Sequence, residues 1–164
     1  MTTPSSAPGA AAPPSRARRV ALFAVVTAAS LGLDLWTKEW AWQTLRREPA
    51  RIVIEGLFQL DFAFNTGSAF GFLRGFAWSR YFFIVITVAA VLYMGRLALT
   101  LPTRFLSGFV AIALIAGGAL GNLHDRFFRV IDTKHGVVDF ILVYYWPGKR
   151  WPAFNIADAA LVAG

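Results

Sequence analysis

The sequence predicts an α-helical membrane protein with a small β element, and three observations support this fold class. Of the 164 residues, 57% are hydrophobic and 15% are charged, against about 25% charged in an ordinary soluble domain. Charged residues are absent from the stretches 20–33, 81–95 and 105–124, as in membrane helices. The tryptophans lie outside these stretches and near their ends, where aromatic rings prefer the headgroup layer. They are Trp36, Trp40, Trp42, Trp78, Trp146 and Trp151.

Four membrane spans are expected, in a single domain that covers residues 16–164. The first three are placed at about 19–37, 79–97 and 104–124. A fourth begins at about residue 153, with the apolar run FNIADAALVAG. This run adds only six residues after Asp158, at about 1.5 Å per residue. We therefore expect the fourth span to be truncated in this chain.

A β element is expected between the first two spans, at about residues 51–75. Apolar residues alternate with others in RIVIEG and in LDFAFN, and a period of two is typical of strands. Asn65-Thr66-Gly67 then forms a turn signal. We expect this element to rest on the membrane surface. The other long connection, residues 127–152, contains two glycines and two prolines, which are too many breakers for one helix.

Residue types that are missing or isolated exclude several kinds of chemistry. The chain has no cysteine, which excludes disulfides, thiolate catalysis and cysteine-based zinc sites. His124 and His135 match no zinc spacing, so no metal and no cofactor is expected. Ser68, Ser79 and Ser107 lack the G-x-S-x-G context of a serine nucleophile. The net charge of +7 is scattered among apolar residues, which favours contact with anionic lipid headgroups over nucleic acid.

The ends of the chain and the distribution of basic residues leave the membrane orientation open. Residues 1–15 are rich in Pro, Ala and Ser, and we expect a disordered tail. If both long connections share one side, the other side carries only five of the 16 basic residues. A plain count by the positive-inside rule would then place the N-terminus outside. Many of the basic residues lie far from span ends, so this count does not settle the orientation.

Five clusters of polar or special residues lie where a span meets a connection. They are Asp34 and Lys38; Asn65 and Gly67; Asn122, Asp125 and Arg126; Asp139; and Asn155 with Asp158. If both long connections share one side, all five clusters meet at one face of the membrane.

The first cluster is interpreted as structural. Asp34 and Lys38 are four positions apart, so on a continuous helix they share a face and can pair. We expect an anchoring ion pair, with the Lys38 ammonium reaching up to the lipid headgroups.

The third cluster is interpreted as a hydrogen-bonding hub. Asn122 precedes Asp125 by three positions and Arg126 by four, which places all three on one flank of the helix. Asp125 and Arg126 are expected to form a local ion pair. Gly117 and Gly121 form a small-xxx-small face on which another helix can pack closely.

The remaining carboxylates are the candidates for chemistry. Asn155 and Asp158 are three positions apart and are expected to face the same way. Asp139 lies in an apolar stretch with no basic residue within three positions. Two carboxyls that are close together away from water share one proton near neutral pH, which supplies a base and an acid together. Such a pair can hydrolyse a peptide bond without serine, cysteine or metal.

Other interpretations stay open from the residues alone. The two carboxylates could serve a helix boundary or a proton pathway. In a small transporter or proton-conducting protein, Asp34, Asp139 and Asp158 would form a relay, which predicts pH-dependent flux without proteolysis. A purely structural membrane partner would leave the five polar clusters unexplained.

Five segments resemble, in order, the signature boxes of lipoprotein signal peptidase, the bacterial signal peptidase II. They are DLWTK, FNTGSAFGF, GGALGNLHDR, GVVDFI and FNIAD, and the resemblance runs from about Arg16 to the end of the chain. It implies a four-span inner-membrane aspartyl protease. Such an enzyme cleaves the signal peptide from diacylglyceryl-modified prolipoproteins, just before the lipid-bearing cysteine.

The resemblance also implies roles for individual residues. Asp139 and Asp158 correspond to the catalytic pair. Support and substrate contact are implied for Asp34, Lys38, Asn65, Gly67, Gly117, Gly121, Asn122, Asp125, Arg126 and Asn155. The resemblance further implies a cytoplasmic N-terminus, an active site near the outer face, and an extracytoplasmic β element that cradles the substrate. Inhibition by the cyclic peptide globomycin is expected.

Overall fold

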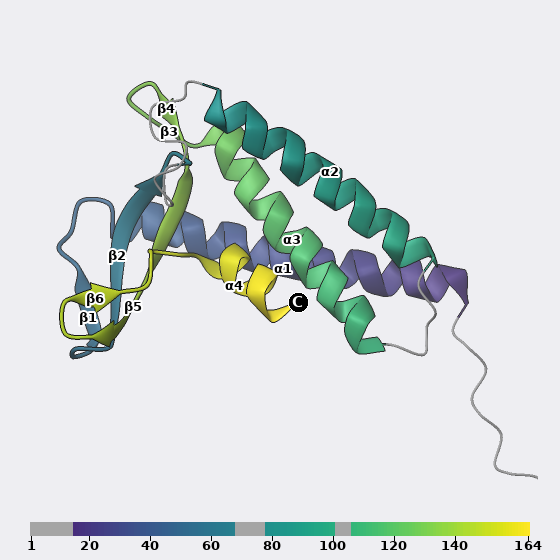
Figure 1. Cartoon of the computed structure of the whole chain (residues 1–164), viewed down its shortest axis with the longest axis horizontal. Helices are drawn as coiled ribbons and strands as arrows, with labels where there is room; N and C mark the ends of the chain where they lie inside the picture. The colour runs from purple at the N-terminus through teal and green to yellow at the C-terminus, as the bar shows by residue number, and fades with distance from the viewer. Residues whose placement is uncertain (1–14, 68–77, 101–105) are drawn as a thin grey trace, which may run out of the picture.

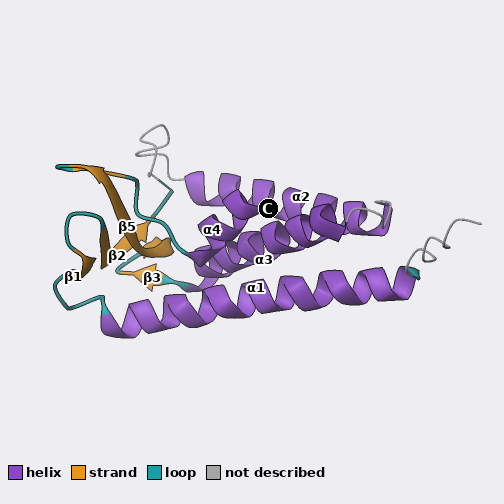
Figure 2. Ribbon diagram, turned by 90° about the horizontal axis from the view of Figure 1, so that it is seen from below, coloured by secondary structure: helices purple, strands orange, loops and turns teal. Residues whose placement is uncertain are grey.

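A small antiparallel sheet lies at one end of three long helices in the computed structural model (Figure 1). The structure describes residues 15–67, 78–100 and 106–164. The helices are α1 (Arg16–Thr44), α2 (Ser79–Thr100), α3 (Leu106–Phe128) and α4 (Ile156–Ala163). The strands are β1 (Arg51–Ile54), β2 (Phe58–Asn65), β3 (Val130–Ile131), β4 (Lys134–His135), β5 (Val137–Trp146) and β6 (Lys149–Arg150). Figure 2 shows the strands gathered beyond one end of the helices.

Three helices are long and apolar enough to cross a membrane, which confirms the first three predicted spans. They are α1, α2 and α3, with 29, 22 and 23 residues. Helix α1 continues beyond the predicted end at about residue 37, because its last turns bury Ala41 against the sheet, with Leu45 just after the helix. The predicted tail up to residue 14 and the start of the third span at 104–105 lie outside the described residues.

Helix α3 is the central helix of the bundle, and glycines bring two neighbours close to its backbone. A Cβ on Gly117 would lie 2.6 Å from the Cβ of Ser30 and 2.7 Å from the carbonyl oxygen of Thr27, both on α1. A Cβ on Gly118 would lie 2.6 Å from the carbonyl oxygen of Ala157 on α4. The Thr27 hydroxyl also donates a hydrogen bond to the carbonyl of Ala113, at 3.2 Å. Close helix packing of this kind is typical of membrane proteins.

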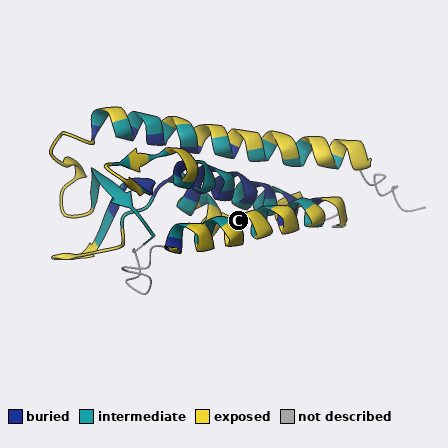
Figure 3. Cartoon of the chain, turned by 90° about the horizontal axis from the view of Figure 1, so that it is seen from above, coloured by how far each residue is buried: buried dark blue, intermediate teal, exposed yellow. Residues whose placement is uncertain are grey.

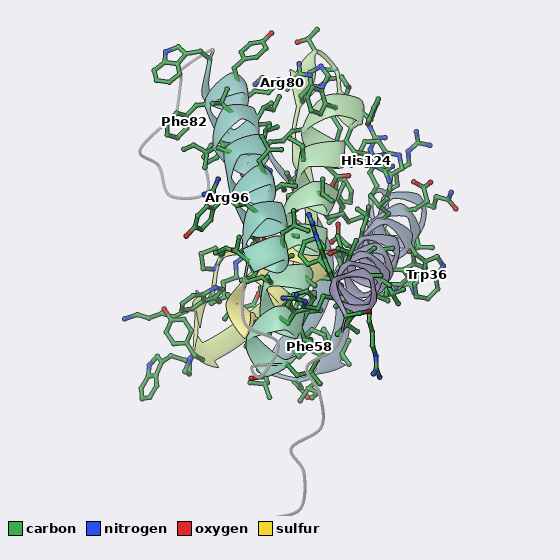
Figure 4. All side chains as sticks on the ribbon, turned by 90° about the vertical axis from the view of Figure 1, so that its right-hand side faces the viewer. Trp36, Phe58, Arg80, Phe82, Arg96 and His124 are labelled. Carbon is green, nitrogen blue, oxygen red and sulfur yellow. The ribbon has the colours of Figure 1, made fainter. Side chains whose placement is uncertain are left out.

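The outer faces of the helices remain exposed, while α3 carries many of the buried residues (Figure 3). Trp36 on α1 and Phe82 on α2 point away from the bundle (Figure 4). Their exposed fractions are 69% and 41%. Apolar side chains directed outward along helices of this length suit a hydrocarbon environment.

The sheet is larger than the sequence predicted. Its strand order is β1-β2-β5-β6, and all neighbouring strands are antiparallel. Strands β1 and β2 confirm the first part of the β element predicted at 51–75, whereas residues 68–75 lie outside the described part. Strand β5 was not predicted. Its first four residues are all buried, so they do not alternate as those of a half-exposed strand do.

The sheet packs on the end of α1 through an aromatic and aliphatic core. Buried Ala41 and Leu45 lie against buried Val138 and Phe140 of β5. Trp40 meets Phe140 edge to face, with ring centroids 6.2 Å apart. This core fixes β5 relative to α1. It therefore also fixes the position of Asp139, which lies between Val138 and Phe140.

Helix α4 begins immediately after the sheet and packs against α1 and α3 (Figure 1). It has eight residues, which corresponds to about 12 Å of helix. A fourth span therefore stays a prediction.

Replacing Gly117 by alanine tests the close approach of α1 and α3. The added methyl group would overlap Ser30 and Thr27, and overpacking of this kind costs about 1–3 kcal/mol. We expect Gly117→Ala to lower the Tm measured in detergent. Gly108→Ala on the same helix is the matched control, because nothing lies within 4 Å of its added Cβ, and alanine is the better helix former by about 1 kcal/mol. Equal Tm values for the two variants would contradict the packing described here.

Candidate active site

Asp139 lies on β5, at the junction between the sheet and the helices. Its side chain is buried, with an exposed fraction of 2%. One carboxylate oxygen accepts a hydrogen bond from the side-chain amide of Asn155 at 2.7 Å. The other accepts from the amide of Asn65 at 3.1 Å. Asn65 can reach Asp139 because β2 and β5 pair in a register that places Asn65 opposite Val137.

Asn65 is itself oriented by a tight turn at the end of β2. Its side-chain oxygen accepts a hydrogen bond from the backbone N–H of Gly67 at 3.0 Å, which leaves the amide nitrogen to face Asp139. Gly67 has a φ of 96°, a conformation that other residues rarely adopt. A Cβ there would also lie 3.0 Å from the ring of Phe83 on α2. The turn predicted from Asn65-Thr66-Gly67 is therefore confirmed.

Asp158 lies in the first turn of α4, where Asn155 is the N-cap. The two residues form a capping box: the Asn155 side-chain oxygen accepts from the Asp158 backbone N–H, and the Asp158 carboxylate accepts from the Asn155 N–H. The other Asp158 oxygen accepts from the amide of Asn122 at 2.9 Å. The positive end of the helix dipole stabilises a negative charge at this position.

Asn155 joins the two carboxyl groups. It is fully buried, donates to Asp139, and accepts from and donates to Asp158 through the capping box. Its amide nitrogen also lies 3.1 Å from the side-chain oxygen of Asn122 and 3.2 Å from the carbonyl oxygen of Val138. One side chain thereby fixes the start of α4, the start of β5 and the site end of α3.

Burial raises the pKa of Asp139 to about 7, and the nearby negative charge of Asp158 adds to this effect. Hydrogen bonds from Asn65 and Asn155 and the positive charge of Lys38 oppose it. A carboxyl with this pKa is protonated in about half of the molecules at neutral pH. One proton shared between Asp139 and Asp158 stays a prediction.

Lys38 supplies the buried positive charge of the site. Its side chain has no exposed surface. Its ammonium lies 2.8 Å from Asp34 and 3.5 Å from Asp125, and it donates to the side-chain oxygen of Asn122 at 2.7 Å. The predicted pair with Asp34 is confirmed. The prediction that Lys38 reaches the headgroups is wrong, because its three partners are all in the interior.

Asp34 connects Lys38 to the start of α4. Its second oxygen accepts a hydrogen bond from the backbone N–H of Ala157 at 2.8 Å. Gly121 of α3 faces the same carboxylate, and a Cβ at Gly121 would overlap the Asp34 oxygen. A glycine is needed there because the carboxylate occupies the space of a side chain.

Asp125 is fully buried and holds the backbone of β5. It accepts a hydrogen bond from the N–H of Val138 at 3.0 Å. The predicted ion pair between Asp125 and Arg126 is wrong: the cations within salt-bridge distance of Asp125 among the described residues are Lys38 and Arg129, and the ring of His124 also lies 3.4 Å from this carboxylate. Adjacent residues on a helix point in different directions, which separates Arg126 from Asp125.

Arg126 instead faces the carboxyl pair. It donates to the carbonyl oxygen of Asn122 at 3.1 Å, and its guanidinium lies 5.0 Å from the ring centroid of Phe83. Its positive charge interacts with Asp158 and Asp139 and, to a smaller extent, with Asp125. Phe83 was missed by the sequence analysis because it is one of many aromatic residues in an apolar span.

The site contains the carboxyl groups of Asp34, Asp125, Asp139 and Asp158, the buried ammonium of Lys38 and the guanidinium of Arg126. Within residues 15–67, 78–100 and 106–164, no group of three or more acidic or histidine side chains is placed to hold a metal ion. The fold and the site together define a multi-pass membrane protein with paired carboxyl groups at the junction of helices and sheet.

Comparison with known proteins identifies the family. The family model described as "Signal peptidase (SPase) II" matches residues 26–164, and the chain belongs to this family. A lipoprotein signal peptidase of Geobacter metallireducens is 40% identical over 147 residues, covering 87% of this chain and 85% of the relative. One from Neisseria meningitidis is 41% identical over 143 residues, covering 85% and 82%.

A solved structure agrees with this assignment. It is described as a bacterial membrane enzyme determined by the in meso method at 1.9 Å resolution. The two chains superpose with a TM-score of 0.72 and 28% identity, over 87% of this chain and 86% of the other. The similarity covers both the helices and the sheet of the fold.

Replacing Lys38 by methionine tests whether its charge holds the site together. Methionine keeps the unbranched shape but leaves Asp34 and Asp125 buried beside each other without their shared cation. Breaking a buried pair in this way costs about 3–5 kcal/mol, so we expect a large fall in Tm in detergent. Lys149→Met on β6 is the control, because Lys149 is exposed. A Lys38→Met protein as stable as this control would mean that the buried charge is dispensable.

Proposed function

We propose that this protein is a membrane aspartyl endopeptidase that removes signal peptides from prolipoproteins, with Asp139 and Asp158 as its catalytic pair. The observation that carries the proposal is that one buried residue, Asn155, donates to both carboxyl groups: its side-chain amide to Asp139 and its backbone N–H to Asp158. The relatives named lipoprotein signal peptidase support the choice of substrate.

The two carboxyl groups divide the chemistry of hydrolysis between them. Ionised Asp158 removes a proton from a water molecule, and the resulting hydroxide attacks the scissile carbonyl carbon. Protonated Asp139 gives its proton to the carbonyl oxygen, which yields a neutral tetrahedral intermediate. In the second step Asp158 passes its proton to the leaving nitrogen while Asp139 takes back the hydroxyl proton. The C–N bond breaks, and the pair returns to its starting state with one proton.

The neighbouring residues keep this proton available at neutral pH. Burial prevents Asp139 from ionising fully, while the capping box and Asn122 hold the carboxylate of Asp158 in place. The pKa of about 7 for Asp139 predicts that activity declines as pH rises through this value, because the acid loses its proton. Asn65 and Arg126 contact the same region and are proposed to orient the substrate.

The proposed enzyme is a single membrane domain covering residues 16–164, with α4 belonging to a fourth span. Its N-terminus lies in the cytoplasm, and its site and sheet lie near the outer face of the bacterial inner membrane. The substrate is a diacylglyceryl-modified prolipoprotein, cleaved just before the lipid-bearing cysteine. Surrounding lipids contact the apolar helix faces, and globomycin is expected to inhibit cleavage.

The rival transporter hypothesis is not favoured. A proton relay would need Asp34 to exchange protons with Asp139 and Asp158. In the structure one oxygen of Asp34 lies 2.8 Å from the ammonium of Lys38, and the other accepts a hydrogen bond from the N–H of Ala157 at 2.8 Å. Membership of a signal peptidase family also favours proteolysis.

The proposed pair is tested by two isosteric substitutions, Asp139→Asn and Asp158→Asn, in protein purified in detergent. Each keeps the shape of the side chain but cannot cycle a proton, so we expect cleavage of a diacylglyceryl-modified prolipoprotein to fall by at least about 10³-fold. Gel mobility of the lipoprotein product measures the cleavage.

Asp132→Asn is the control for this experiment. Asp132 lies exposed between β3 and β4 with a φ of 55°, a conformation that asparagine also tolerates. It should retain full activity. Cleavage that survives in a folded Asp139→Asn or Asp158→Asn protein would contradict the two-aspartate mechanism.

A further inference from the structure

The indole of Trp42, near the end of α1, connects three parts of the fold. Its two flanking cations are Arg46, with a guanidinium carbon 4.4 Å from the ring centroid, and Arg129, at 4.9 Å. The ring also meets Phe62 and Phe64 of β2 edge to face, at 5.7 Å and 6.1 Å. A cation over an indole face is among the stronger cation–π arrangements.

Arg129 differs from Arg46 in its further contacts. It follows the end of α3, and its side chain is only 13% exposed. One guanidinium nitrogen lies 2.6 Å from the carboxylate of Glu39, and another lies 3.6 Å from Asp125. Arg129 therefore joins α1 and α3 while it covers Trp42.

Asp125 connects Arg129 to strand β5, which carries Asp139 of the proposed catalytic pair. Asp125 accepts a hydrogen bond from the N–H of Val138, the residue before Asp139. The strand β2, whose Phe64 packs on Trp42, pairs with β5 at the same place, with Ala63 opposite Asp139. Arg129 thus braces β5 through Asp125 and through Trp42.

Arg129 also affects the site through the balance of charges around Asp125. Buried Asp125 faces two cations at similar distances, Lys38 at 3.5 Å and Arg129 at 3.6 Å. If Arg129 were removed, Asp125 would draw Lys38 more strongly. A shift of Lys38 towards Asp125 would weaken its hydrogen bond to Asn122, whose amide nitrogen donates to Asp158. Both carboxyl groups would lose part of their alignment.

We propose that Arg129 is a positioning residue for the reaction: it balances the charge of Asp125 and clamps the indole of Trp42, and so holds Asp139 and Asp158 in register. This inference rests on the proposed function. Arginine suits the role because its flat guanidinium can cover a ring and pair with carboxylates at its edge, which a lysine ammonium cannot do together.

The test compares Arg129→Met with Arg46→Met in purified full-length protein that cleaves a diacylglyceryl-modified prolipoprotein. Both variants remove a guanidinium from Trp42, but only the first removes a cation from Asp125 and Glu39. We expect Arg129→Met to lower kcat about tenfold or more, with KM within about twofold, because alignment is lost and substrate binding is kept. We expect Arg46→Met to stay within about twofold of the parent. Arg129→Lys keeps the positive charge but lacks the planar guanidinium, so it should recover part of kcat.

The split between kcat and KM separates positioning from general stability. Rates are compared per folded molecule, at a temperature well below the Tm of each variant. The inference is overturned if Arg129→Met keeps the parental kcat, if it changes only KM, or if Arg46→Met lowers kcat as much. Parent and Asp139→Asn proteins are run in the same assay. No cleavage by the parent, or equal cleavage by Asp139→Asn, would overturn the proposed function itself and this inference with it.

Discussion

A positive charge that has no access to water organises this site. The ammonium of Lys38 is enclosed by Asp34, Asp125 and Asn122, because a buried charge without partners would cost several kcal/mol. Each partner in turn fixes a different element: Asp34 binds the first turn of α4, and Asp125 binds the backbone of β5. The alignment of helices and sheet therefore depends on one buried ion pair and its extensions.

The two proposed catalytic carboxyls come from elements of different kinds, and this gives them different properties. Asp139 lies on a buried strand, where loss of water favours the protonated form. Asp158 lies at a helix N-terminus, where its carboxylate accepts a hydrogen bond from the backbone N–H of the N-cap Asn155. Asn155 joins them as the helix cap. In the proposed mechanism, the difference between one acid and one base arises from the secondary structure that carries each carboxyl group.

The sequence predicted the parts of this architecture that follow from local spacing or composition. The helical pairing of Asp34 with Lys38 follows from four-residue spacing, and three spans follow from charge-free stretches. Asp139 could be singled out because no cation lies near it in sequence. Strand β5 was missed because burial removes the alternation that marks strands. Tertiary partners such as Arg129, and the inward direction of Lys38, depend on how distant elements pack and leave no local signal.

The central claim is that burial beside Asp158 keeps a proton on Asp139 near neutral pH. The pKa of this carboxyl is about 7 in the folded protein and about 3.9 when unfolded, so between these values the folded state binds more protons. The free energy of unfolding should then decrease as pH rises from about 4 to about 7. The Asp139→Asn variant has no titrating group at this position. The most direct test therefore measures the free energy of unfolding of the parent and of this variant in detergent, as a function of pH. The account predicts that the parent loses stability relative to the variant across this range, whereas parallel pH dependences would contradict it.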